Sequence, residues 1–165
     1  MVLASRDIET LNLISDEINS NGGSSIAVKT DVTSLDSCNN MIKESIRAFG
    51  KIDSLILNAG ISMWARFDNI TDISLFHKIN EINYQGSVNC VYASIDELKK
   101  NNGQIVAITT AQALMGFPNA SAYSASKHAL HGFLETLQME LGNAISVSNV
   151  YLGWIKGTNL RANDL

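Results

Sequence analysis

The fold is decided by the stretch Ile105-Val106-Ala107-Ile108-Thr109-Thr110, an apolar, β-branched run that ends in two hydroxyl residues. Short apolar runs of this kind recur along the chain, and most are bounded by Gly, Asn, Asp or Ser. The other runs are Val2-Leu3-Ala4, Ile26-Ala27-Val28, Leu55-Ile56-Leu57 and residues 145–151. Their length and composition are typical of strands that are buried on both faces of a parallel sheet.

Segments with apolar residues at every third or fourth position lie between these runs and predict helices. The first covers residues 8–18 and ends at Asn21-Gly22-Gly23. The others cover about residues 38–49, 74–100 and 121–141, and each is followed by glycine or by asparagine with glycine. Alternating strands and helices imply parallel strands joined by right-handed crossovers. The predicted fold class is therefore α/β, a doubly wound parallel sheet with helices on both faces.

The composition describes one globular domain, which we place at residues 1–165. Of the 165 residues, 45% are hydrophobic and 17% are charged, and this balance fits a compact core. A formal net charge of −4 argues against a general binder of nucleic acid or of anionic membranes. No apolar run approaches the roughly 20 residues that cross a bilayer, and residues 1–6 do not resemble a secretory leader. We therefore expect a cytoplasmic protein whose partners include neither nucleic acid nor membrane.

The cysteines and histidines give no sign of a metal site. Cys38 and Cys90 are far apart in the sequence and match no metal-ligand or CxxC spacing, so two reduced thiols are expected. His128 and His131 are three residues apart, but no Cys, Asp or Glu completes a metal set at a familiar spacing. The sequence therefore predicts no bound metal.

The first candidate catalytic residues are Tyr123 and Lys127, which are four residues apart on a predicted helix and so lie on one face. A lysine ammonium beside a phenol favours the phenolate and lowers the tyrosine pKa from about 10 toward neutrality, as a general acid working near pH 7 requires. Thr110 ends the preceding strand, where open α/β sheets place their ligands. Taken alone, a Tyr-x-x-x-Lys pair is more often an ordinary surface pair, so its interpretation depends on the motifs around it.

Three more motifs stand in order before this pair. Asp31-Val32-Thr33 follows one strand, Asn58-Ala59-Gly60 follows the next, and Asn83 lies within the long predicted helix. Together with the pair and the hydroxyl residue that precedes it, these motifs resemble the classical short-chain dehydrogenase/reductase family over almost the whole chain. The resemblance implies a Rossmann-like fold and an oxidoreductase that interconverts a carbonyl and a secondary alcohol by hydride transfer.

The resemblance also implies a role for each member of the catalytic set. Tyr123 would donate a proton to a carbonyl or take one from an alcohol, and Lys127 would bind the nicotinamide ribose and lower the pKa of Tyr123. Asn83 would anchor a water of the proton relay, and Thr110 would orient the substrate oxygen. Threonine stands where the family usually has serine, so we expect reduced rather than abolished chemistry. The predicted substrate contacts are Thr110, Gln112 and Tyr123.

The cofactor predicted from this resemblance is NADP(H) in preference to NAD(H). A carboxylate at the end of the second family strand would bind the adenosine ribose and select NAD, but Ser5 stands there and Arg6 follows it. Arg6 carries a planar cation that suits the 2′-phosphate of NADP; the alternative is a solvated charge at the end of a strand. The predicted cofactor-binding residues are Ser5, Arg6, Asp31, Val32, Asn58, Ala59, Gly60, Tyr123, Lys127, Gly153 and Thr158.

Two loops resemble the hydroxysteroid-dehydrogenase-like branch of the family. They are Ile61-Ser62-Met63-Trp64-Ala65-Arg66-Phe67, after the Asn-Ala-Gly motif, and Gly116-Phe117-Pro118, before the catalytic helix. The candidate residues for an apolar substrate cleft are Met63, Trp64, Met115 and Phe117. Ordinary packing of the loops explains the same residues equally well, and the sequence does not identify the substrate.

The chain departs from the family pattern at both ends. It lacks the first strand-helix unit of the family and the glycine-rich turn that receives the cofactor pyrophosphate. The absent strand would lie between residues 2–4 and 55–57, so these strands either pair directly or present open edges that a partner chain fills. The absent helix would leave apolar sheet surface in water. Toward the other end, Leu152 replaces a family proline, Thr158 falls one residue late, and the last family strand has no counterpart.

Two functions follow from these observations. The first is the NADP(H)-dependent oxidoreductase, with Tyr123 as general acid and base and a small-molecule carbonyl or alcohol as substrate. The second is a non-catalytic remnant or fragment that binds no cofactor and acts, if at all, as an assembly partner. The predicted helices at residues 74–100 and 121–141 match those through which many family members associate, so a homodimer or homotetramer is expected.

Overall fold

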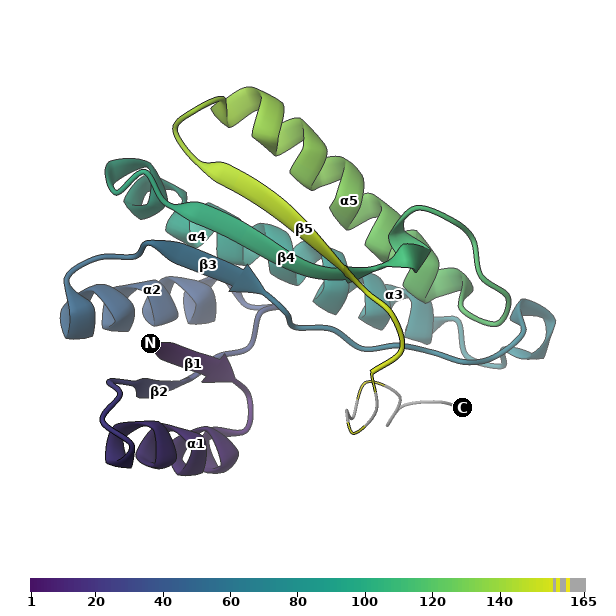
Figure 1. Cartoon of the computed structure of the whole chain (residues 1–165). Coiled ribbons are helices and arrows are strands. Elements are labelled where there is room, and N and C mark those ends of the chain that lie inside the picture. Colours follow the sequence, from purple (N-terminus) through teal and green to yellow (C-terminus); the bar gives the residue numbers. More distant parts are fainter. Residues whose placement is uncertain (156, 158–159, 161–165) are drawn as a thin grey trace.

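All five apolar runs form strands, and the strands make two parallel sheets. The computed structural model describes residues 1–155, 157 and 160 of the chain. The strands are β1 (Val2–Ser5), β2 (Ile26–Lys29), β3 (Ser54–Leu57), β4 (Gln104–Thr110) and β5 (Ser146–Leu152). β1 pairs with β2 in one sheet, and the second sheet has the order β3-β4-β5. The Rossmann-like arrangement of parallel strands joined through helices is the predicted one (Figure 1).

A gap between β1 and β3 separates the two sheets. Within residues 1–155, no hydrogen-bonded ladder joins the sheets, so β1 and β3 do not pair directly. The sequence left open whether these two strands pair directly or present open edges. In the structure they present open edges. The edges of β1 and β3 that face this gap therefore retain backbone groups without a strand partner.

Helices lie between the strands, and two of them begin at residues whose side chains cap the first turn. They are α1 (Ile8–Ser20), α2 (Leu35–Phe49), α3 (Ser74–Asn80), α4 (Gly86–Lys100) and α5 (Ser121–Leu141), with short 3-10 turns η1 (Phe67–Asn69) and η3 (Ala111–Ala113). Asp7 caps α1 by accepting a hydrogen bond from the Thr10 amide at 3.1 Å. Gly50 ends α2 with a φ of 76°, a left-handed conformation that favours glycine. The predicted helix 74–100 is helical throughout, and the π-helical segment η2 (Glu81–Gln85) separates its α-helical parts α3 and α4.

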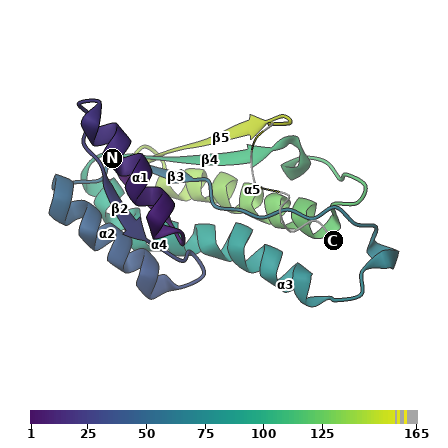
Figure 2. The ribbon, with the colours of Figure 1, turned by 90° about the horizontal axis from the view of Figure 1, so that it is seen from below.

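The helices cover the two sheets unequally. α1 lies against β1 and β2 on the side away from α2 (Figure 1). α4 packs against β3 and α5 against β5, both on one face of the second sheet, and no described helix covers its other face (Figure 2). Ile56 of β3 is accordingly 55% exposed. The apolar sheet surface expected from the sequence is therefore open to solvent.

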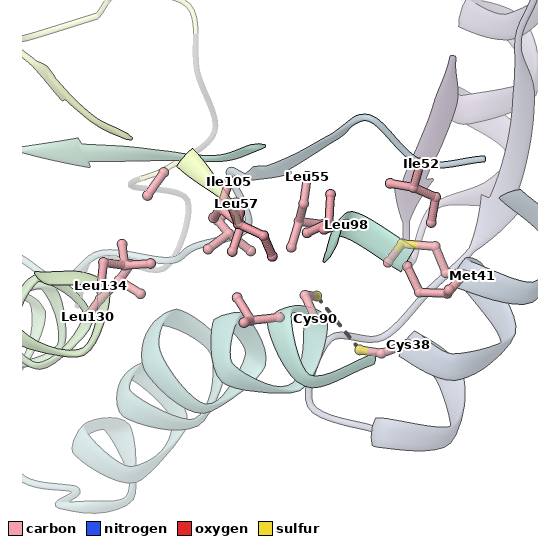
Figure 3. Close-up of a cluster of buried hydrophobic side chains, with 14 of the residues drawn as sticks. Cys38, Met41, Ile52, Leu55, Leu57, Cys90, Leu98, Ile105, Leu130 and Leu134 are labelled. Atoms are coloured by element: carbon pink, nitrogen blue, oxygen red, sulfur yellow. Dashed lines mark hydrogen bonds between the residues drawn. The ribbon is translucent and has the colours of Figure 1, made fainter. Parts of the chain in front are cut away.

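Two hydrophobic clusters hold the elements together. The larger contains residues of α2, β3, α4, β4 and α5, including Met41, Leu55, Leu98, Ile105 and Leu134 (Figure 3). The smaller includes the predicted catalytic Tyr123 and contains Ile61, Met63, Ile79, Ala120 and Ala122 as well. Met63 is only 1% exposed, which supports loop packing for this residue, whereas Met115 and Phe117 are 59% and 40% exposed.

Candidate active site

The predicted catalytic pair lies buried in the first turns of α5. Tyr123 is 7% exposed and Lys127 is 5% exposed. The Lys127 Nζ atom lies 5.9 Å from the centroid of the Tyr123 ring. The helical spacing thus brings the ammonium over the ring of Tyr123, as the one-face argument predicts.

Burial changes the protonation of both residues. Desolvation lowers the pKa of Lys127 to about 8 and raises the pKa of Tyr123 above its ordinary value. The expectation that Lys127 lowers the Tyr123 pKa is therefore wrong for the chain as described, since the loss of water around the phenol dominates. Lys127 forms no ion pair with a carboxylate among residues 1–155, and its charge is held without an acidic partner.

Asn83 connects the catalytic helix to the end of β3. Its side chain is fully buried and lies in the π-helical segment η2. The Oδ1 atom accepts a hydrogen bond from the Ile61 amide at 2.8 Å, and the Nδ2 group donates to the Ile61 carbonyl at 2.9 Å. Nδ2 also donates to the Ser126 hydroxyl at 3.0 Å, and that hydroxyl donates to the Tyr123 carbonyl at 2.8 Å. A buried amide satisfied in this way fixes the position of the segments that it joins.

The Asn58-Ala59-Gly60 motif passes close to the same residues. A Cβ atom at Gly60 would lie 3.3 Å from Asn83 Oδ1 and 3.7 Å from Lys127 Nζ. Glycine therefore lets the backbone that leaves β3 approach the catalytic lysine and asparagine.

Two of the predicted substrate contacts, Thr110 and Gln112, lie at the carboxyl end of β4. Thr110 is half-buried, and its hydroxyl accepts a hydrogen bond from the Gln112 amide at 3.4 Å. Gln112 Oε1 in turn accepts a hydrogen bond from the Ser124 hydroxyl at 3.3 Å. This bond ties the turn after Thr110 to the helical turn that contains Tyr123.

A cavity of about 420 Å³ lies between the two sheets. It is lined from both sides by predicted cofactor-binding residues, namely Ser5, Arg6, Asp31, Val32, Asn58, Ala59 and Gly60. Hydrogen bonds from the Thr33 amide and hydroxyl, and then the charge of Arg6, hold the pKa of Asp31 below its usual value. A guanidinium and a carboxylate thus share one end of the cavity.

The loop that carries Asp31 and Val32 is held by α4. Asn89 Nδ2 donates to the Val32 carbonyl at 2.9 Å. A Cβ atom at Gly86 would lie 2.6 Å from Val32 Cγ2, so only glycine permits the helix and the loop to approach this closely. Sequence reasoning missed both contacts, because neither Gly86 nor Asn89 belongs to a motif that indicates this loop.

The remaining predicted residues lie after β5. Gly153 is exposed in the segment that follows Leu152, and Thr158 lies outside the described residues. Within the part of the chain that the structure describes, no group of three His, Cys, Asp or Glu side chains could hold a metal ion. In the same part, every helix is too short or too polar to cross a membrane.

This combination of fold and site matches one family. The family model described as short chain dehydrogenase matches residues 1–164. The chain belongs to the short-chain dehydrogenase family. The expected family membership is thereby confirmed.

Several curated relatives of this short-chain dehydrogenase carry hydroxysteroid dehydrogenase names, which bears out the predicted branch. The chain is 38% identical over 154 residues to 11-beta-hydroxysteroid dehydrogenase-like 3 of Arabidopsis thaliana, and this match covers 93% of the chain and 50% of that protein. The chain is 31% identical over 162 residues to 11-beta-hydroxysteroid dehydrogenase of Pinus massoniana, and this match covers 98% of the chain and 46% of that protein. The chain thus spans about half the length of the curated relatives that it matches.

Solved structures of similar fold confirm the predicted fold class. An alcohol dehydrogenase from the archaeon Thermococcus sibiricus, complexed with 5-hydroxy-NADP, superposes with a TM-score of 0.89 at 23% identity, covering 96% of this chain and 66% of that one. A short-chain dehydrogenase/reductase from Burkholderia phymatum, in complex with NAD, superposes with a TM-score of 0.84 at 27% identity. This match covers 90% of this chain and 54% of that one.

Two features of this family member could not be found by motif. Ser126 is fully buried between Asn83 and the Tyr123 carbonyl; the available signal was its helical spacing of three residues from Tyr123. Near the catalytic end, the ring of Trp64 lies 6.1 Å from that of Phe117 and 6.2 Å from that of Trp154, between ring centroids. The two loops singled out by the branch resemblance therefore meet through aromatic contacts.

Proposed function

We propose that the protein is an NADP(H)-dependent oxidoreductase that interconverts a carbonyl and a secondary alcohol, with Tyr123 as general acid and base. The observation that carries this proposal is the buried catalytic arrangement, in which Asn83, Ser126, Tyr123 and Lys127 lie in one connected region. Family membership supports the reaction class, and the closeness of these residues supports their proposed roles in it.

The protonation of the site suits reduction of a carbonyl. The raised pKa of Tyr123 keeps its phenol protonated at neutral pH, so that it can donate a proton to the substrate oxygen. Lys127, with a pKa of about 8, is mostly charged at pH 7 and stabilises the phenolate that remains after this transfer. Thr110 would donate a hydrogen bond to the same oxygen. A bound nicotinamide supplies or accepts the hydride.

The described residues fit both ends of a dinucleotide. At one end, the buried Lys127 ammonium has no carboxylate partner among them and suits the hydroxyls of the nicotinamide ribose. At the other end, Arg6 beside the cavity suits a 2′-phosphate, which supports NADP(H) over NAD(H). Asp31 and Val32 would contact the adenine, and Asn58, Ala59 and Gly60 would line the path between the two ends. Gly153 and Thr158 remain predicted contacts of the carboxamide group on the nicotinamide ring.

The substrate class is supported by the aromatic loops. Trp64, Phe117 and Trp154 bring three rings together at the end of the molecule where Tyr123 lies. Aromatic faces favour apolar, ring-containing partners. We therefore propose an apolar ketone or secondary alcohol as substrate, in keeping with the hydroxysteroid names of the relatives.

Assembly and location complete the proposal. Tyr92 of α4 is 70% exposed and Met139 of α5 is 75% exposed, which supports association of two or four copies through these helices. Cys38 and Cys90 match no CxxC or metal-ligand spacing in the sequence, which supports a reducing compartment such as the cytoplasm.

A second candidate function is that of a partner chain without cofactor. The gap between β1 and β3 favours it, because within the described residues no strand connects the two sides of the proposed cofactor site. A fluorescence titration with NADPH and with NADH separates the two functions. Saturable binding that favours NADPH, followed by reduction of an apolar ketone, supports the oxidoreductase; binding of neither nucleotide overturns it in favour of the second candidate.

A further inference from the structure

The two cysteines of the chain lie side by side in the core. Cys38, on α2, and Cys90, on α4, are 52 residues apart in the sequence, yet their Sγ atoms are 3.7 Å apart (Figure 3). They are 0% and 6% exposed. Their spacing along the chain predicts no such contact, and the catalytic arrangement uses neither thiol.

The pair stands at the junction of the two sheets. α2 packs against β2 and α4 packs against β3, while α2 and α4 pack against each other. No ladder joins the sheets within residues 1–155, so this helix contact is a principal connection between them. A covalent bond at this position would tie the two sheets together.

The cavity between the sheets gives a small molecule access to the pair through Cys90. Cys90 lines the cavity of about 420 Å³ between the sheets. Cys38 also contacts the loop at the cavity wall, with its Sγ atom 3.7 Å from the Val32 carbonyl oxygen. The pair is thus buried from bulk solvent but adjacent to an internal space.

We propose that Cys38 and Cys90 form an oxidative modification site, at which hydrogen peroxide or a related hydroperoxide converts the two thiols into a disulfide that links the two sheets. In the first step, the Cys38 sulfur attacks the peroxide, the O–O bond breaks, and Cys38 becomes a sulfenic acid while one water leaves. In the second step, the Cys90 sulfur displaces the hydroxyl of the sulfenic acid, the S–S bond forms, and a second water leaves. Two thiols are oxidised and one peroxide is reduced to two waters.

The environment of the two sulfurs supports this order of events. The hydrogen bond between the two thiols lowers the pKa of Cys38 and raises that of Cys90. Cys38 is therefore the more nucleophilic of the two thiols toward peroxide. The resolving thiol already lies in contact with it, and a disulfide requires the sulfurs to approach to about 2.0 Å. Rotation of the two side chains and a small shift of α2 against α4 would supply this approach.

The test is the mass of the native chain after treatment with hydrogen peroxide. Cys38 and Cys90 are the two cysteines of the sequence, so a monomer that loses two hydrogen atoms and gains no oxygen contains the proposed bond. Dithiothreitol should restore the mass, and a peptide that joins both cysteines should appear after proteolysis. Because the bond closes a long loop across the two sheets, the Tm should rise by about 10 °C.

The single variants Cys38→Ala and Cys90→Ala are matched controls. Each should take up oxygen or form intermolecular dimers in place of the internal bond, and neither should gain in Tm with peroxide. The proposal is overturned if the native chain stays reduced, acquires only sulfinic or sulfonic acid, or is bridged only between chains. It does not depend on nucleotide binding, since the mass and the Tm are measured on the chain alone.

Discussion

The catalytic half of the molecule and its cofactor half hold their functional residues in different ways. Around Tyr123, the side chains of Asn83, Ser126 and Lys127 are all buried, and hydrogen bonds join Asn83 to Ser126 and Ser126 to the Tyr123 backbone. At the end of β1, by contrast, Arg6 is exposed. A buried polar group is held by the partners that it must have, whereas an exposed one is free to solvate.

The difference shows which part of the site the chain organises by itself. The groups that would transfer the proton belong to β4, η2 and α5, whose apolar residues pack into the two hydrophobic clusters. The groups that would bind the adenosine belong to β1 and β2, whose sheet is not hydrogen-bonded to the other. The strength of cofactor binding therefore depends on how the two sheets are held, while the catalytic geometry does not.

The largest expected effect comes from the centre of the catalytic half. Replacing Tyr123 with phenylalanine removes the proton donor and leaves the ring in the core. Turnover of an apolar ketone with NADPH should fall by about 100- to 10,000-fold, while the dissociation constant of NADPH should change little. Tyr92→Phe, at an exposed position on α4, is the matched control and should retain full activity. Turnover retained by Tyr123→Phe would contradict the assigned role.

A smaller effect tests whether the buried network fixes this half of the molecule. Asn83→Ala leaves the Ile61 amide and carbonyl without their partner. Buried polar groups that lose a partner cost about 1–3 kcal/mol each, so the free energy of unfolding should fall by roughly 3 kcal/mol. Urea denaturation measures this change. Asn80→Ala, at an exposed position of α3, should stay within about 0.5 kcal/mol of the parent chain; equal losses in the two variants would show that the network contributes nothing.

The same contrast explains what sequence reasoning could reach. The strands could be predicted from the apolar runs, and the bounds of α5 from the helical spacing of its apolar residues and the glycine that follows, because these signals are local in the sequence. The catalytic set follows from motifs in a fixed order. The π-helical segment that contains Asn83, the contact of Asn89 with the Val32 loop and the Cys38–Cys90 pair depend on packing between distant segments, which a single sequence does not encode in any short pattern. The predicted direction of the Tyr123 pKa shift was wrong for a related reason, because burial in the folded chain sets that direction.

A third prediction concerns the charge buried in the catalytic half. The pKa of Lys127 is about 8 in the folded chain and 10.5 for the unperturbed side chain. Protonated Lys127 therefore costs the folded state free energy below pH 8, and this cost disappears as the pH rises from 8 to 10.5. Lys127→Met should raise the free energy of unfolding by up to about 3 kcal/mol at pH 7 and should abolish turnover. The gain should vanish above pH 10.5.

Stability curves of the Lys127→Met variant and the parent at several pH values check this prediction. Lys43→Met, at an exposed position on α2, is the control and should show no gain that depends on pH in this range. A gain for Lys127→Met that stayed constant with pH would assign the effect to packing of the methionine, not to the buried charge.

The smallest effect belongs to the cofactor half, where the functional groups are exposed. Arg6→Ala removes the cation that would bind the 2′-phosphate, so NADPH should bind about tenfold more weakly while NADH binding changes by less than about twofold. Ser5→Asp supplies the carboxylate that selects the unphosphorylated ribose and should reverse the preference toward NADH. Fluorescence titrations of both nucleotides measure these ratios. Equal losses of NADPH and NADH affinity in Arg6→Ala would mean that Arg6 supports the sheet edge or the Asp31 loop and does not read the phosphate.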